Sequence, residues 1–197
     1  WTTVAGALNA TRECSDAAGI AAAQALFPTA SDNCDGNVSN IVKVSGAFVA
    51  GSCPNAGTYT NTWTVTDDCG NTSTVFTQVI TLTDNTAPTW TTAAGALNAT
   101  LECSDAAGIA AAQALFPTAS DNCDADVTNI VKVSGAFVAG SCPNAGTYTN
   151  TWTVTDDCGN TSTVFTQVIT ITDFTAPILT PPATQTLNVG AGNLCRV

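Results

Sequence analysis

The chain has 197 residues, with 15 Asp plus Glu against 4 Lys plus Arg, no histidine, nine cysteines and a net charge of −11. This charge argues against nucleic acid and anionic membrane surfaces as partners, because both need a basic footprint, and it favours divalent cations. No apolar run approaches the roughly 18 residues of a membrane-spanning helix, so no membrane insertion is expected. A signal peptide is not recognisable either, so any export signal is expected outside this sequence.

The sequence repeats itself with an offset of 89 residues, since Trp1 aligns with Trp90 (90 − 1). A repeat at fixed period indicates a tandem array of one structural unit. The remnant after the second copy predicts that the array continues past Val197. The expected domains are repeat 1 over residues 1–88, repeat 2 over residues 89–177 and the start of a third, truncated repeat over residues 178–197.

The first half of each unit has mixed signals. Residues 1–13 predict a short first strand that Gly6 interrupts. The alanine-rich residues 17–27 predict a short helix with Asp16 as its N-cap and Pro28 as its stop, although an irregular strand remains an alternative. Turn residues then dominate up to position 37, and residues 38–50 alternate well enough for one or two strands.

The second half of each unit is the most regular part of the sequence. Strands are predicted over residues 58–66 and 73–83, where β-branched and aromatic residues recur with period two. Residues 68–71 supply the turn between them, so the pair forms a β-hairpin. The expected fold is all-β: tandem immunoglobulin-like antiparallel β-sandwich repeats, with a short helix in each and disulfides as staples.

Each full unit has four cysteines, and with no histidine and no CxxC pair a zinc or redox motif is disfavoured. An even number of cysteines at repeated positions predicts disulfides and an oxidising, extracellular setting. Chain direction places the first and third cysteine of a unit at one end and the second and fourth at the other. The predicted pairs are Cys14–Cys53, Cys34–Cys69, Cys103–Cys142 and Cys123–Cys158, with Cys195 pairing beyond Val197.

The acidic residues also gather near the ends of the unit. In an end-to-end array, the lower end of repeat 1 meets the upper end of repeat 2, and carboxylates from both ends would face one another. Such a cluster suits Ca²⁺, which takes six to eight oxygen ligands, whereas the alternative is that these residues only form turns and caps. The candidate calcium ligands are Glu13, Asp16, Asp84, Asp121, Asp124, Asp156 and Asp157.

No catalytic set can be assembled from this sequence. It has no histidine base, every cysteine of a full unit has an expected partner, and no glycine-rich phosphate loop follows a strand. We therefore expect no enzymatic activity in these repeats.

Four motifs together resemble a known family: ATLECSD, ASDNCD, TWTVTDDCGNTSTVFTQVITITD and TDNTAP. They are similar to the hyalin-type (HYR-like), immunoglobulin-like repeats of giant Bacteroidetes cell-surface adhesins, and most of all to the SprB-type gliding-motility adhesins. The resemblance implies a long, thin, outer-membrane-associated surface protein that is exported by type IX secretion and acts in adhesion or gliding motility. The link TDNTAP also resembles part of the cadherin linker, where calcium stiffens the joint.

The expected function is mechanical, as the stalk of a large extracellular adhesin that extends from the cell surface. Its expected partners are the neighbouring repeats of the same chain, and surface glycans or other adhesin chains remain open. Two alternatives are a spacer module of a large secreted enzyme and a glycan-binding or self-associating filament module.

Overall fold

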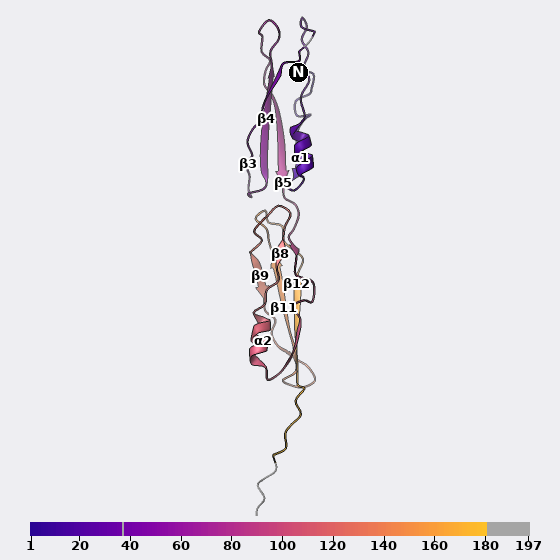
Figure 1. The fold of residues 1–197 in the computed structure, drawn as a ribbon, viewed down its shortest axis with the longest axis vertical. Coiled ribbons are helices and arrows are strands. Elements are labelled where there is room, and N and C mark those ends of the chain that lie inside the picture. The colour runs from indigo at the N-terminus through magenta and orange to yellow at the C-terminus, as the bar shows by residue number, and fades with distance from the viewer. Residues whose placement is uncertain (37, 181–197) are drawn as a thin grey trace, which may run out of the picture.

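A computed structural model describes residues 1–36 and 38–180. The two repeats lie end to end along one long axis, with α1 and α2 on different sides of it (Figure 1). The second repeat is therefore turned about this axis relative to the first. Most of the predicted third repeat, and Cys195 with it, lies outside the described residues. Within those residues, no helix is long and apolar enough to cross a bilayer.

Each repeat has one main sheet and one short helix. Repeat 1 contains β1 (Ala10–Glu13), α1 (Ala17–Gln24), β2 (Ile41–Val44), β3 (Val49–Ala50), β4 (Gly57–Val65) and β5 (Phe76–Thr83). Repeat 2 contains β6 (Thr89–Trp90), β7 (Ala99–Glu102), α2 (Ala106–Gln113), β8 (Ala119–Ser120), β9 (Ile130–Val133), β10 (Val138–Ala139), β11 (Gly146–Val154) and β12 (Phe165–Thr172).

The predicted hairpin forms the centre of the main sheet. In repeat 1 the order is β1-β5-β4-β2, with β3 also paired to β4. Side chains on β4 and β5 alternate between the core and the surface, so Trp63 and Ile80 are fully buried. Gly70 closes the turn with a φ of +88°, a conformation that glycine adopts without strain. The hairpin was predicted correctly, with strand ends that differ by at most three residues.

One strand pairing departs from the predicted antiparallel arrangement. β1 pairs with β5 in parallel, with Ala10 opposite Ile80 and Glu13 opposite Thr83. A parallel pair needs a crossover connection, and the chain between β1 and β5 provides it through α1, which returns the chain to the upper end, and then through β2, β3 and β4. Both strands therefore run toward the lower end of the repeat, where Cys14 and Asp84 leave them side by side.

The helix confirms the predicted N-cap but is shorter than predicted. The side chain of Asp16 accepts a hydrogen bond of 2.9 Å from the backbone N–H of Gly19, and the helix ends at Gln24 instead of residue 27. Ala23 on α1 packs against Ile80 and the rest of the sheet core. In repeat 2, β6 and β8 pair beside the main sheet, so each unit is sandwich-like with a reduced second layer.

A buried amide network joins the helix to the sheet. Gln78 is fully buried, and its Nε2 donates to the backbone oxygens of Leu8 (2.6 Å) and Ala23 (3.0 Å). The Nδ2 of Asn61 donates in turn to Gln78 Oε1 (3.0 Å) and Gln24 Oε1 (2.8 Å). Buried polar groups of this kind stabilise a fold only when they are paired. Repeat 2 has the same network around Gln167.

Candidate functional site at the joint between the repeats

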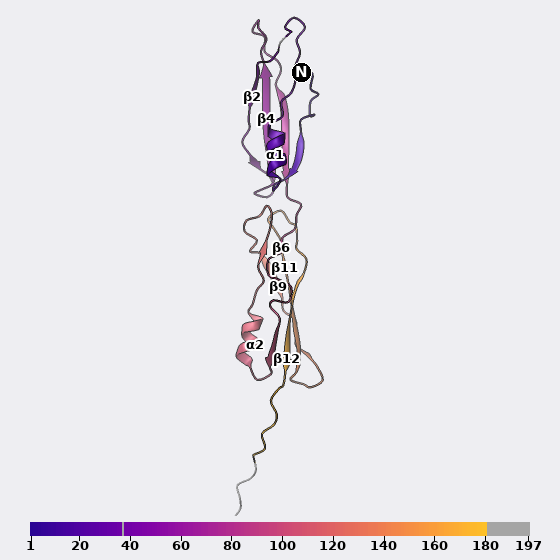
Figure 2. The same ribbon diagram turned by 45° about the vertical axis from the view of Figure 1, so that its right-hand side comes forward.

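The joint is where the lower end of repeat 1 meets the upper end of repeat 2 (Figure 2). The lower end of a repeat consists of the residues that follow β1 and β5 and the turn before β4. The upper end consists of the loop after the helix and the hairpin turn. In repeat 2 these two segments are residues 118–126 and 156–160.

Two disulfides cross this joint. Cys14 of repeat 1 bonds to Cys123 of repeat 2, with their Cα atoms 5.9 Å apart. Cys53 bonds to Cys158, with a Cα–Cα distance of 5.2 Å. Both distances lie in the ordinary range for disulfides. The two repeats are therefore covalently clamped at two points, across sequence separations of 109 and 105 residues.

The predicted pairing of Cys14 with Cys53 is wrong, although the two residues do share the lower end. Cys14 follows β1 at the edge of the sheet, whereas Cys53 lies in the turn before β4, and β5 runs between these strands. Strands lie about 4.8 Å apart, so these positions are about 10 Å apart, beyond the roughly 7 Å that a disulfide spans. Each cysteine instead reaches across the joint.

The other three predicted pairs do not form either. Cys123 and Cys158 bond to repeat 1 and not to each other, and the predicted Cys34–Cys69 and Cys103–Cys142 bonds do not form in the part of the chain that the structure describes. These four cysteines are the counterparts, at the outer ends of the two repeats, of the four that bond across the joint.

Asparagine side chains add three hydrogen bonds across the joint. Asn122 Nδ2 donates to Ser15 Oγ (2.8 Å), and Asn160 Nδ2 donates to the backbone oxygen of Asp84 (3.1 Å). Asn55 Nδ2 donates to the backbone oxygen of Cys123. These asparagines were not among the candidate residues predicted from the sequence, although a signal was present. Each asparagine lies within two positions of a cysteine that bonds across the joint.

Three of the seven predicted calcium ligands gather in one cluster. Asp84 follows β5, Asp121 follows β8, and Asp156 lies in the turn after β11, with ligand oxygens within 4.8 Å of one another. Asp84 is 9% exposed and Asp156 is 5% exposed. Oδ2 of Asp121 is buried and has no hydrogen-bond partner among the described residues. We call these three residues the joint cluster.

The joint cluster has unfavourable electrostatics when all three carboxylates are charged. Burial raises the pKa of Asp84, and the charges of Asp121, Asp156 and Glu13 raise it further, while a hydrogen bond from the backbone N–H of Thr86 opposes the shift. A raised pKa of this kind is typical of a carboxylate that is buried near other negative charges without a positive charge to offset them. A divalent cation bound between the three carboxylates would supply that charge.

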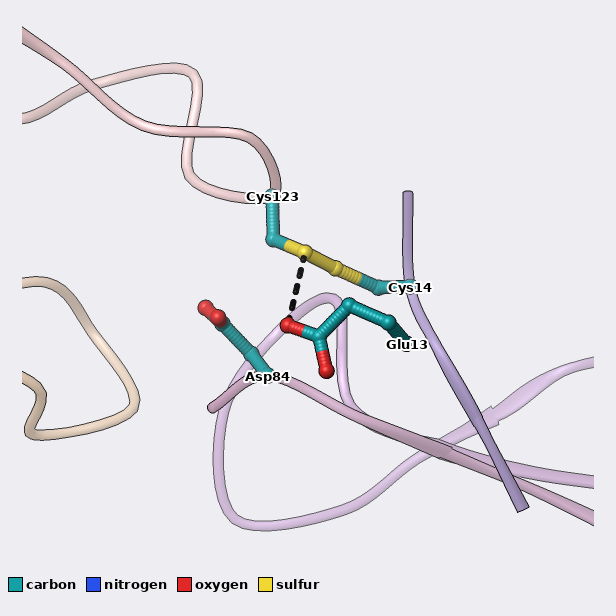
Figure 3. Close-up of side chains that lie close together, drawn as sticks. All are labelled: Glu13, Cys14, Asp84 and Cys123. Atoms are coloured by element: carbon teal, nitrogen blue, oxygen red, sulfur yellow. Dashed lines mark hydrogen bonds between the residues drawn. A yellow bond between two sulfur atoms is a disulfide. The ribbon is translucent and has the colours of Figure 1, made fainter. Parts of the chain in front are cut away.

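Glu13 lies beside the joint cluster but is occupied with the link between the repeats. Its carboxylate accepts hydrogen bonds from Asn85 N (3.0 Å), Asn85 Nδ2 (3.3 Å) and Thr86 Oγ1 (3.1 Å). The backbone bond from Asn85 is the largest of the effects that lower the pKa of Glu13. Figure 3 shows the Glu13 carboxylate between Asp84 and the Cys14–Cys123 disulfide, 4.0 Å from Cys123 Sγ.

Asp16 and Asp124 form a cap and a turn, as the alternative interpretation expects, but Asp121 and Asp156 of the joint cluster also accept local backbone hydrogen bonds. Asp16 caps α1 and lies 3.8 Å from the guanidinium of Arg12. Asp124 accepts from the backbone N–H of Asp126 (2.9 Å) and of Asp157 (3.2 Å), which ties the upper loop to the hairpin turn. The structure does not bring Asp16, Asp124 or Asp157 into the joint cluster.

Comparison with known proteins agrees with the repeat architecture. Residues 91–171 match the family model of the "HYR-like domain with 4 cysteines". No curated protein matches the chain by sequence. Among solved structures, the fibronectin(III)-like modules of Clostridium thermocellum CbhA share 16% identity at a TM-score of 0.30, over 60% of this chain and 64% of theirs.

Two cadherin-type structures score similarly. Human protocadherin-24 EC1-2 shares 13% identity at a TM-score of 0.30, over 77% of this chain and 89% of its own. Mouse clustered PcdhgC3 EC1-3 shares 10% sequence identity at a TM-score of 0.29, over 61% of this chain and 44% of its own. These scores are too low to relate the joints of the proteins. Residues 2–82 differ from residues 91–171 at only six positions, so the segment that matches the HYR-like family model is present twice in this chain.

Proposed function

We propose that this chain is a segment of the stalk of a large extracellular bacterial adhesin, which extends from the cell surface for adhesion or gliding motility. The observation that carries the proposal is the pair of disulfides across the joint. A single covalent bond leaves rotation about one point, whereas two bonds at separate points resist both bending and twisting. The clamped repeats therefore act as one rod and not as two beads on a flexible string.

The chemistry of the joint fits the outside of the cell. Disulfides persist in oxidising compartments, and cytosolic thiols are kept reduced. A protein that carries load between a surface and a distant ligand also gains from covalent joints, because a disulfide does not yield when a non-covalent interface would separate. Identical repeats let the length of such a stalk change with copy number alone.

Small-angle scattering of the chain with and without reductant tests the mechanical part of the proposal. We expect an extended particle of narrow shape distribution when the disulfides are intact, and a broad distribution with a smaller mean dimension after reduction. A broad distribution with both joint disulfides verified by mass spectrometry would contradict the stalk function. Specific retention on a glycan array, unchanged by reduction, would instead favour the glycan-binding alternative.

We also propose that the joint cluster binds Ca²⁺. Asp84, Asp121 and Asp156 offer carboxylate oxygens from both repeats, and Oδ2 of Asp121 is buried with no hydrogen-bond partner in the described structure. Hard divalent cations prefer such oxygens. A bound ion would offset the repulsion among the three charges and stiffen the joint further.

Isothermal titration with Ca²⁺, at a pH where all three carboxylates are ionised, tests this site. We expect one ion per joint, and no binding at the joint in the Asp121→Asn variant. The matched control is Asp32→Asn, because Asp32 occupies the same position in repeat 1 but lies at an outer end. This variant should bind Ca²⁺ at the joint as the wild type does. Equal binding by the wild type and the Asp121→Asn variant would contradict the site.

A further inference from the structure

The outer ends of the two repeats carry the same cysteines as the joint. Cys103 and Cys142 occupy, in repeat 2, the positions that Cys14 and Cys53 occupy in repeat 1. Cys34 and Cys69 likewise occupy the positions of Cys123 and Cys158. All four outer cysteines are in no disulfide within the described residues. Each repeat thus has a lower and an upper half of the same clamp.

We propose that the outer cysteines are half-clamps that bond to further repeats of the same kind: Cys103 and Cys142 to the upper-end cysteines of one, and Cys34 and Cys69 to the lower-end cysteines of another. This inference rests on the proposed function and gives it a pairing rule. A lower-end cysteine bonds to an upper-end cysteine of the neighbour, first to second and third to fourth.

The lower end of repeat 2 has a cavity like the one that the neighbouring repeat closes at the joint. At the joint, a cavity of about 250 Å³ is lined by Cys14, Phe48, Asn55 and Tyr59 of repeat 1 and closed by Cys123 and Asn122 of repeat 2. The lower end of repeat 2 has the corresponding cavity of about 360 Å³. Its lining includes the equivalent residues Cys103, Phe137, Asn144 and Tyr148.

Three of the four outer cysteines are more exposed than their counterparts in the joint, whereas Cys103 is half-buried, as Cys14 is. Cys53 is only 6% exposed in the joint, whereas its counterpart Cys142 is exposed. At the upper end of repeat 1, Cys34 and Cys69 are both exposed. These two cysteines line one cavity of about 160 Å³ together with Asp32 and three other acidic side chains. An upper-end cysteine pair is therefore presented on one surface.

The carboxylates are divided between the ends in the same way. Asp173 and Glu102 accompany Cys103 at the lower end of repeat 2, as Asp84 and Glu13 accompany Cys14 at the joint. Asp32 and Asp67 at the upper end of repeat 1 are the counterparts of Asp121 and Asp156. A new joint would therefore complete a second joint cluster along with its two disulfides.

Each bond would form by thiol–disulfide exchange with a small-molecule disulfide as oxidant. One cysteine thiolate attacks a sulfur of the oxidant and releases one thiolate, which takes up a proton. The second cysteine thiolate then attacks the mixed disulfide and releases the other half of the oxidant. Two protein thiols are oxidised and one disulfide is reduced to two thiols.

The pKa of the Cys103 thiol is raised at the lower end of repeat 2. Burial raises its pKa, and the charges of Asp173 and Glu102 raise it further. Since the thiolate is the attacking species, Cys103 is expected to react slowly with free oxidant at neutral pH. The upper-end cysteine of a docked neighbour would be held next to it, which favours the correct bond over solution oxidation.

Two complementary variants of the full chain test the pairing, each with Cys195→Ser. The first carries Cys34→Ser and Cys69→Ser and keeps only its lower half-clamp; the second carries Cys103→Ser and Cys142→Ser and keeps only its upper one. In glutathione redox buffer, we expect each variant alone to stay monomeric. The mixture should give dimers but nothing larger than a dimer. Peptide maps should show Cys103–Cys34 and Cys142–Cys69 cross-links.

A three-repeat chain, made by duplicating residues 90–178, tests the same bonds with the neighbour tethered at high effective concentration. With Cys195→Ser in both chains, we expect four free thiols in the three-repeat chain, the same number as in the two-repeat chain. The proposal is overturned if neither experiment yields the two cross-links, or if Cys34–Cys69 or Cys103–Cys142 bonds form within one repeat. If Cys34–Cys69 or Cys103–Cys142 bonds form while the Cys14–Cys123 and Cys53–Cys158 bonds stay intact, the half-clamp proposal fails but the stalk function is not contradicted.

Discussion

Cys53 is bonded to Cys158 across the joint, while Cys142, the counterpart of Cys53 in the second repeat, is exposed and unbonded in the described structure. The sequences around the two cysteines are the same, GSCPNAG. Their different states therefore come from the presence or absence of a neighbouring repeat. The joint, and not the repeat, is the unit that the disulfides stabilise.

Removing both joint disulfides should loosen the rod without unfolding the sheets. In a variant with Cys14→Ser, Cys53→Ser, Cys123→Ser and Cys158→Ser, the joint keeps only its hydrogen bonds and its link. We expect a smaller and broader distance distribution between labels on the two repeats in single-molecule fluorescence. The melting temperature should also fall. Closing one loop of about 100 residues contributes at most roughly 5 kcal/mol to the free energy of unfolding, and this contribution is lost with each disulfide.

The matched control replaces Cys34, Cys69, Cys103 and Cys142 by serine. These cysteines are unbonded in the described structure, so the distance distribution should stay narrow. Equal broadening in both variants would show that the joint disulfides do not set the stiffness.

Replacing Asp84 by asparagine should stabilise the joint at neutral pH when no divalent cation is present. Burial and neighbouring charges raise the pKa of Asp84, so the docked state binds a proton more tightly than the undocked state does. The wild-type joint therefore gains stability as the pH falls through this raised pKa toward the ordinary value for aspartate. Asp84→Asn should remove that gain, and at neutral pH raise stability by on the order of 1 kcal/mol.

Thermal melts across the acidic range, with chelator and with Ca²⁺, measure this effect. With chelator, Asp84→Asn should melt higher than the wild type, and with Ca²⁺ the order should reverse. Asp173→Asn is the control, because Asp173 is the exposed counterpart at the lower end of repeat 2. A wild type whose melting temperature is insensitive to both pH and Ca²⁺ would contradict the prediction.

Replacing Glu13 by glutamine should weaken the hold on the link. Its carboxylate accepts from Asn85 and Thr86, and the bond from the Asn85 backbone is the main cause that lowers the pKa of Glu13. The stabilisation is therefore complete above the ordinary glutamate pKa and is lost as the pH falls through the lowered one. Glu13→Gln should cost about 1 kcal/mol at neutral pH and remove this acid dependence.

Hydrogen exchange at the Asn85 amide would report the loss directly. The comparable variant is Glu102→Gln. The Glu102 carboxylate accepts hydrogen bonds from Phe174 N (2.8 Å) and Thr175 Oγ1 (3.3 Å) at the lower end of repeat 2, and the variant weakens them. It should therefore speed exchange there and leave Asn85 protected. Unchanged exchange at Asn85 in Glu13→Gln would refute the assigned role.

Replacing Gln78 by leucine should destabilise repeat 1 strongly. The change leaves the buried backbone oxygens of Leu8 and Ala23 and the Asn61 amide without their Gln78 partner. The Asn61 amide keeps its bond to Gln24 Oε1, so two backbone oxygens become unpaired. Unpaired buried polar groups cost about 1–3 kcal/mol each, and we therefore expect a loss of about 2–6 kcal/mol in chemical denaturation. Thr77→Val, on the exposed face of the same strand, should have almost no effect. A similar loss from both variants would argue against the network.

Local patterns in the sequence predicted much of the repeat correctly. The hairpin follows from two-residue periodicity and a turn that contains Gly70, and the start of α1 follows from Asp16, since both signals act between residues that are close in sequence. The parallel pairing of β1 with β5 was not predictable in this way. It depends on how Ala10 meets Ile80, 70 residues further on, after the helix has returned the chain.

The candidate site was predicted only in outline. The repeat showed that the lower end of repeat 1 would face the upper end of repeat 2, and it placed Asp84, Asp121 and Asp156 among the candidates. It could not separate these three from Asp16 and Asp124, because all five have the spacing of turn and cap residues. All five accept local hydrogen bonds, Asp121 from Cys123 N and Asp156 from Cys158 N among them, so only the tertiary structure shows which carboxylates also meet across the joint.

The sequence by itself determined the repeat, the hairpin and the end of the unit to which each cysteine belongs, because these depend on composition, periodicity and chain direction. The tertiary structure alone decided which sulfur atoms bond. A disulfide needs its two Cα atoms within about 7 Å; strand order keeps the lower-end cysteines of one repeat farther apart than that, and docking of the next repeat brings each within reach of a partner.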